Sequence, residues 1–101
     1  MLTPDRFIQQ MRARLAEFDA ELSDLEDAVD DSRVQDDTAL ESDLRTLQRQ
    51  RDAFEEQLLE LETGSEAPWE GMREELEAAW ANLEAELARI RAGFQRARSR
   101  L

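Results

Sequence analysis

The sequence predicts an all-α protein, an antiparallel coiled-coil helical hairpin with a long first helix that dimerises into a bundle. Apolar residues recur at alternating spacings of three and four, which is the repeat of a coiled-coil seam. The 101 residues include only three Gly and two Pro, too few for the tight turns of a β sandwich or barrel. Apolar residues make up 41% and charged residues 38%, a balance that suits long helices burying one stripe.

The first helix is expected to begin at Pro4, because Thr3 can cap it and proline suits the first helical position. Its apolar stripe ends at Val29. Six residues of this stripe are the expected interface, either in the core or between copies: Ile8, Met11, Leu15, Phe18, Leu22 and Leu25.

The stretch 30–39 contains only Val34 and Ala39 as apolar residues, and the stripe slips by one residue across it. A skip inside one continuous helix would explain the slip, and so would a loop. Thr38 and Glu41 fit a capping box and favour the loop, whereas the absence of Gly and Pro favours the continuous helix. We prefer a continuous helix over 4–62; the alternative is a three-helix up-down-up bundle. The second stripe contains Leu40, Leu44, Leu47, Arg51, Phe54, Leu58 and Leu61.

Arg51 is the one charged residue in these stripes. We expect it to pair with a carboxylate across the interface or to extend to solvent, and to fix the register of the helices rather than to act in a functional site.

A turn is expected at 63–66, where Gly64 can end one helix and Ser65 can cap the next, which spans 67–100. Trp69 and Trp80 lie about three helical turns apart and are expected to pack at the hairpin end; the alternative is a platform for a ligand. The whole chain, 1–101, is then a single helical domain. The last stripe contains Leu76, Trp80, Leu83, Leu87, Ile90, Phe94, Ala97 and Leu101.

A continuous helix over 4–62 would be about 85–90 Å long, but the second helix only about 50 Å. Half of the long seam would then be bare, and a second copy would be the simplest cover. We therefore predict a homo-oligomer, most simply a dimer.

The sequence contains no His and no Cys, so zinc sites of the usual kind, thiol nucleophiles and Ser-His-Asp triads are excluded. Its acidic clusters are expected to be solvated helix faces. We expect no catalytic residues, no metal, no cofactor and no small-molecule substrate. The longest apolar run, Ala78-Ala79-Trp80-Ala81, has four residues and the N-terminus has no secretory signal pattern, so a cytoplasmic protein is expected.

The net charge is −12, but residues 87–101 carry five Arg and no acid, so the rest of the chain carries −17. We expect these arginines to pair with acids of a neighbouring helix. The alternative is that this basic amphipathic segment contacts an anionic membrane surface. The acidic body would repel phosphate, and nucleic acid is not expected as a partner. The candidate residues are Arg89, Arg91, Arg96, Arg98 and Arg100.

Several motifs resemble a family of small bacterial coiled-coil proteins labelled as stress-response proteins. The segment from Phe7 to Glu26, with Met11, Leu15, Phe18 and Leu22 between, is similar to the opening helix of that family. Further matching motifs are Leu44-Arg45, Arg51-Asp52, Trp69-Glu70 and Ala79-Trp80-Ala81-Asn82-Leu83. This chain departs from the family by having no Lys and by its Asp-rich stretch at 30–37. The resemblance implies a soluble helical protein without catalytic residues, linked to stress.

Together, these observations predict a non-catalytic coiled-coil protein that acts through protein–protein interaction or as a structural protein. Its partner would be a second copy or another protein. The alternative function is peripheral binding to a membrane or lipid surface through the basic C-terminal helix.

Overall fold

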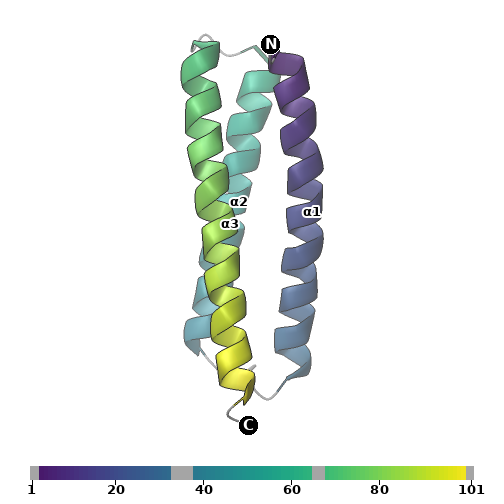
Figure 1. Ribbon diagram of the computed structural model, residues 1–101, viewed down its shortest axis with the longest axis vertical. Coiled ribbons are helices and arrows are strands. Elements are labelled where there is room, and N and C mark those ends of the chain that lie inside the picture. Colours follow the sequence, from purple (N-terminus) through teal and green to yellow (C-terminus); the bar gives the residue numbers. More distant parts are fainter. Residues whose placement is uncertain (1–2, 33–37, 65–67, 100–101) are drawn as a thin grey trace.

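The computed structural model describes residues 3–32, 38–64 and 68–99, and within these ranges it contains three helices and no strand. They are α1 (Pro4–Asp31), α2 (Thr38–Glu62) and α3 (Trp69–Ser99). The three helices lie side by side along the long axis of a body of 50 × 20 × 17 Å (Figure 1). The prediction of an all-α helical bundle is confirmed.

The start of α1 matches the sequence prediction. Thr3 has an extended backbone (φ −93°, ψ 158°), and its hydroxyl oxygen accepts a hydrogen bond from the backbone N–H of Arg6 at 3.3 Å. Pro4 occupies the first turn, where its missing N–H costs no intrahelical hydrogen bond.

The end of α1 corrects the preferred prediction of one helix over 4–62. The helix stops at Asp31, and Ser32 takes an extended backbone (φ −98°, ψ 169°). The backbone N–H and the hydroxyl of Ser32 both donate to the carbonyl of Val29, at 3.2 Å and 2.9 Å, so side-chain capping ends the helix without Gly or Pro. The next helix begins at Thr38, and residues 33–37 lie outside the described residues. The slip of the apolar stripe therefore marks a helix end.

The end of α2 follows the prediction at Gly64. This glycine has φ +87°, a left-handed conformation that side chains disfavour. The N–H of Thr63 donates to the carbonyl of Leu59 at 2.9 Å, and that of Gly64 donates to Leu61 at 3.3 Å. The predicted cap Ser65 lies outside the described residues.

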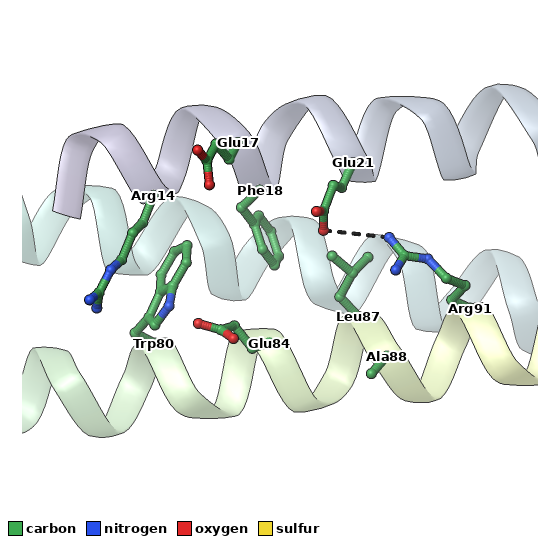
Figure 2. Close-up of a pocket in the computed structure, with 9 residues that line it drawn as sticks. All are labelled: Arg14, Glu17, Phe18, Glu21, Trp80, Glu84, Leu87, Ala88 and Arg91. Carbon is green, nitrogen blue, oxygen red and sulfur yellow. Dashed lines mark hydrogen bonds and ion pairs between the residues drawn. The ribbon is translucent and has the colours of Figure 1, made fainter. Parts of the chain in front are cut away.

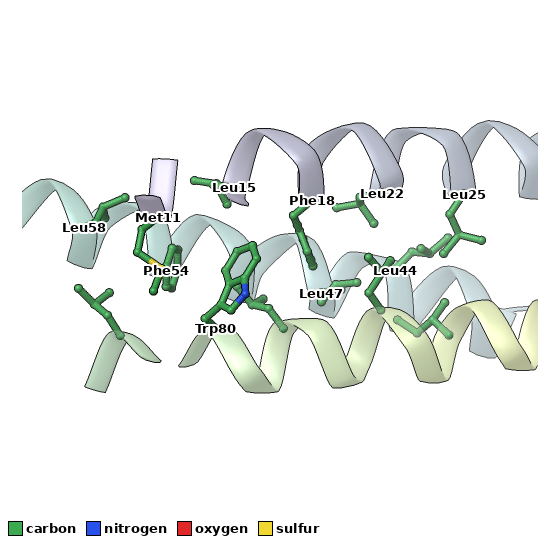
Figure 3. Packing of buried hydrophobic residues seen from close by; sticks show 14 of the residues in the cluster. Met11, Leu15, Phe18, Leu22, Leu25, Leu44, Leu47, Phe54, Leu58 and Trp80 are labelled. Carbon is green, nitrogen blue, oxygen red and sulfur yellow. The ribbon is translucent and has the colours of Figure 1, made fainter. Parts of the chain in front are cut away.

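The core is formed by apolar side chains of all three helices (Figure 3). No polar or charged side chain is buried among the described residues. The stripes of the three helices cover one another within one chain, so the bare seam that led to the dimer prediction is absent from the described residues. The six predicted interface residues are all in this core: Ile8, Met11, Leu15, Phe18, Leu22 and Leu25.

The two tryptophans occupy different levels of the bundle. Trp69 contacts Phe7 edge to face, with ring centroids 5.3 Å apart, at the end where α3 begins. Trp80 lies about 16 Å further along α3. It packs between Phe18 of α1 at 5.6 Å and Phe54 of α2 at 5.5 Å. The prediction that both pack at the hairpin end is thus wrong for Trp80, which contacts aromatic rings of both other helices.

Candidate binding groove between α1 and α3

The basic C-terminal segment forms ion pairs with both neighbouring helices. Arg89 pairs with Glu86 of its own helix at 2.7 Å and with Asp43 of α2 at 3.4 Å. The hydrogen bond with Glu86 is the main reason why the pKa of Arg89 is raised. Arg91 reaches Glu21 of α1 at 3.5 Å. For Arg89 and Arg91, the expected pairing with acids of a neighbouring helix is confirmed.

The last described turn of α3 differs from this pattern. Arg96 and Arg98 are exposed, and neither forms an ion pair with any residue in the described ranges. Arg100 lies outside the described residues. These two guanidinium groups at the end of the bundle are therefore open to solvent.

Arg51 bridges α1 and α2 as the sequence analysis anticipated. Its Nε and Nη2 donate to the two carboxylate oxygens of Asp19, each at 2.7 Å. It also pairs with Asp52 at 3.1 Å and with Glu55. The hydrogen bond with Asp19 is the main cause that raises the pKa of Arg51, while partial burial opposes it. This bidentate contact joins residues 32 positions apart and defines the register of α1 against α2.

A groove of about 400 Å³ opens between α1 and α3 (Figure 2). Its floor consists of three core side chains, Phe18, Trp80 and Leu87, which are 3%, 7% and 4% exposed. Its exposed rim consists of Arg14, Glu17 and Glu21 from α1 and Glu84, Ala88 and Arg91 from α3. Apolar floor and charged rim thus meet in one concave surface.

The indole nitrogen of Trp80 is the unsatisfied polar atom of this groove. Nε1 is buried and has no hydrogen-bond partner within the part of the chain that the structure describes. An indole nitrogen is only a donor, and leaving a buried donor unpaired costs about 1–3 kcal/mol. Figure 2 shows this nitrogen on the edge of the ring that faces Glu84.

The charges of the rim are only partly used within the chain. Glu21 is paired with Arg91. Among the described residues, Glu17 and Glu84 have no ion-pair partner, and neither has Arg14. The groove therefore presents carboxylates from its two walls, α1 and α3, without a cation between them.

Phe18 and Trp80 were predictable as apolar stripe residues, but the groove above them was not. Glu17 and Glu84 each lie beside a core position, where a solvated carboxylate is the ordinary expectation. The signal that the sequence did contain is Ala88, the one short side chain in the lining, placed directly after Leu87. A short side chain at that position leaves the floor accessible.

No described helix is long and apolar enough to cross a membrane. Within the same ranges, no group of three or more acidic side chains is placed to hold a metal ion. Comparisons with family models, curated proteins and solved structures find no match to this chain.

Proposed function

We propose that this chain is a non-catalytic interaction protein that binds a protein partner through the α1–α3 groove. The observation that carries the proposal is a groove whose floor of Phe18, Trp80 and Leu87 is apolar and whose rim is charged. Following the resemblance noted in the sequence, the proposed role is related to stress.

The composition of the groove fits a protein interface. Such interfaces combine a desolvated apolar centre with a polar rim, and Trp and Arg are enriched among the residues that contribute most binding energy. Here Trp80 and Phe18 supply the apolar centre, and charged residues on both walls supply the rim. A pocket of a few hundred Å³ suits one anchor side chain of a partner.

The proposal includes the arrangement of the chain as a closed three-helix up-down-up bundle. Ion pairs support it for each pair of helices: Asp19 with Arg51, Glu21 with Arg91, and Asp43 with Arg89. The dimer stays a prediction. It would form through exposed faces, because the apolar stripes are buried against one another.

A photo-crosslinking amino acid in place of Arg14, on the rim of the groove, tests the proposed function while the groove at Ala88 stays open. The matched control is the same amino acid in place of Arg49, which is exposed on α2 and does not line the groove. We expect one protein to be captured through position 14 and not through position 49. The purified partner should bind the wild-type chain and bind Ala88→Gln more weakly, as measured by calorimetry. Equal capture at both positions, or equal binding by the variant, would refute the proposal.

A second candidate function is binding to an anionic membrane surface through the end of α3. The observation that favours it is that Arg96 and Arg98 are exposed without ion pairs among the described residues. Co-sedimentation with anionic vesicles, lost at high salt and lost in Arg96→Gln/Arg98→Gln, would support this function. No binding to the vesicles at low salt would exclude it.

A further inference from the structure

We propose that a second copy of this chain docks on the α2–α3 face, with the two copies antiparallel about a two-fold axis. The α2–α3 face is the exposed side along which α2 and α3 lie next to each other, centred on Gln50 and Asn82. It does not include the α1–α3 groove, so this proposal goes beyond the proposed function and does not depend on it.

The centre of the α2–α3 face is a hollow of about 220 Å³ that is lined by no charged residue. Buried Phe54 and Leu83 form its floor, and two alanines and three amides form its walls. The wall residues are Gln50, Ala53, Gln57, Ala79 and Asn82. A chain with a net charge of −12 repels its own copies, so two copies can approach most closely where the surface carries no charge.

The three amides of the hollow suit a two-fold axis. Gln50, Gln57 and Asn82 are exposed, and their side chains form no hydrogen bond with the described residues. A two-fold axis brings the same patch of both copies together. An amide carries both a donor and an acceptor, so it can pair with its own image, whereas a carboxylate or a guanidinium would meet a like charge.

The position of the axis along the bundle follows from the ion pair between Asp43 and Arg89, at 3.4 Å. Asp43 lies seven residues from Gln50 on α2, and Arg89 lies seven residues from Asn82 on α3. Gln50 and Asn82 therefore lie at the same level of the bundle, which agrees with the hollow that they share. An axis at this level crosses both helices at an amide.

An antiparallel arrangement about this axis brings unpaired opposite charges together on α2. Glu60 lies ten residues, about 15 Å, from Gln50 on one side, and Leu40 lies equally far on the other side. Leu40 lines a second hollow together with Arg96. Glu60 of each copy therefore comes next to Arg96 of the other. Neither Glu60 nor Arg96 forms an ion pair within the described part of its own chain.

The same rotation brings opposite charges together on α3. Glu75 and Arg89 lie seven residues on either side of Asn82, so Glu75 of each copy faces Arg89 of the other. A parallel dimer would instead gather Glu60 and Glu75 of both copies at one end, where they repel one another. Charge complementarity therefore selects the antiparallel arrangement.

The α2–α3 face is large enough for a stable interface. The body is 50 Å long and measures 20 and 17 Å across. One lengthwise face of such a body is comparable to the roughly 800 Å² that each partner buries in an interface of standard size. Two copies can thus form a dimer without opening the core of either chain.

Sedimentation equilibrium of the full chain tests the position of the interface. We expect a dimer with a Kd below about 0.1 mM. The variant Gln50→Glu/Asn82→Asp places like charges at the axis and should weaken dimerisation about tenfold or more, with an unchanged circular dichroism spectrum. The control Gln9→Glu/Gln10→Glu adds the same charge at exposed positions of α1, outside the α2–α3 face, and should dimerise as the wild type does.

Pulsed electron resonance tests the orientation, because spin labels can be attached to Gly71→Cys or Ala78→Cys in a chain without Cys. Both positions are exposed on α3 and lie 11 and 4 residues from Asn82. In the antiparallel dimer, the distance between two labels at position 71 exceeds that between two labels at position 78 by about 21 Å. In a parallel dimer the two distances would be equal.

Three results would overturn the proposal. A chain that stays monomeric at about 0.5 mM would leave this face to solvent or to a different protein. Equal weakening in the control variant would place the interface on another face, and equal label distances at positions 71 and 78 would refute the antiparallel arrangement. Crosslinking through position 14 is unaffected by these outcomes, so a failure of this proposal is distinguishable from a failure of the proposed function.

Discussion

The contact between Arg51 and Asp19 gives the most informative stability prediction. It is a bidentate pair with both distances at 2.7 Å, and the two side chains are 21% and 40% exposed. Fully exposed ion pairs contribute about 0–1 kcal/mol, whereas hydrogen bonds to charged groups contribute about 1.5–3 kcal/mol. Because this pair is partly exposed, we expect a coupling free energy of about 1 kcal/mol between the two side chains.

The coupling is measured with the wild type, Asp19→Asn, Arg51→Gln and the double variant. Urea unfolding at neutral pH, followed by circular dichroism, gives the free energy of unfolding of each protein. The matched control cycle uses Asp52→Asn instead of Asp19→Asn, again with Arg51→Gln. Asp52 also pairs with Arg51, but its side chain is 68% exposed. There we expect a coupling below about 0.5 kcal/mol.

The reasoning fails if Asp19 and Arg51 show no coupling. The residues are 32 positions apart, so one continuous helix would separate them by about 48 Å and abolish any direct interaction. A coupling of about 1 kcal/mol requires α1 and α2 to lie side by side.

Three further predictions concern stability. Leu83→Ala should lower the free energy of unfolding by about 2–5 kcal/mol, because the side chain is 2% exposed. The control Glu56→Ala, at an exposed position, should change it by less than about 0.5 kcal/mol. Similar values for the two variants in urea unfolding would contradict the core assignment. Gly93→Ala should raise the free energy of unfolding by about 0.5–1 kcal/mol, because alanine favours the helix more than glycine does. The added Cβ has room, since its nearest neighbour is the flexible guanidinium of Arg96 at 3.9 Å. A lower melting temperature would contradict this prediction. Arg89→Gln/Arg91→Gln should lower the melting temperature more at about 0.01 M salt than at about 0.1 M salt. The reason is that the added salt shortens the Debye length from about 30 to about 10 Å and screens the ion pairs. An equal loss at both salt concentrations would show that the ion pairs contribute little.

The parts of the fold that depend on local chemistry were predictable from the sequence. Thr3 and Pro4 define a helix start through one side-chain hydrogen bond and a fixed φ. Gly64 ends a helix because it adopts a positive φ at low cost. The apolar repeat identified the core because residues that share the helical period share one face of a helix. For Arg51 the sequence left a cross-helix pair and extension to solvent open, and the structure contains the pair with Asp19.

The end of α1 was not predictable in the same way. The N–H and the hydroxyl of Ser32 both donate to the carbonyl of Val29. This helix end needs no Gly or Pro, so the usual sequence signal of a helix end is missing. A slip in the repeat fits a skip and a helix end equally well, and tertiary packing decides between them. The groove depends on packing too, because only the approach of α1 to α3 brings Glu17 and Glu84 to one surface.

The central claim is that one chain closes its own core and leaves the α1–α3 groove at its surface. Arg12 of α1 forms an ion pair with Glu62 of α2, 50 positions away. Because the chain has no Cys, spin labels can be attached to Arg12→Cys/Glu62→Cys and their distance measured by pulsed electron resonance, with excess unlabelled chain to suppress contacts between copies. Since neighbouring helices pack about 8–10 Å apart, we predict a label distance below about 25–30 Å. One continuous helix would place the labels about 75 Å apart, and that result would contradict the account.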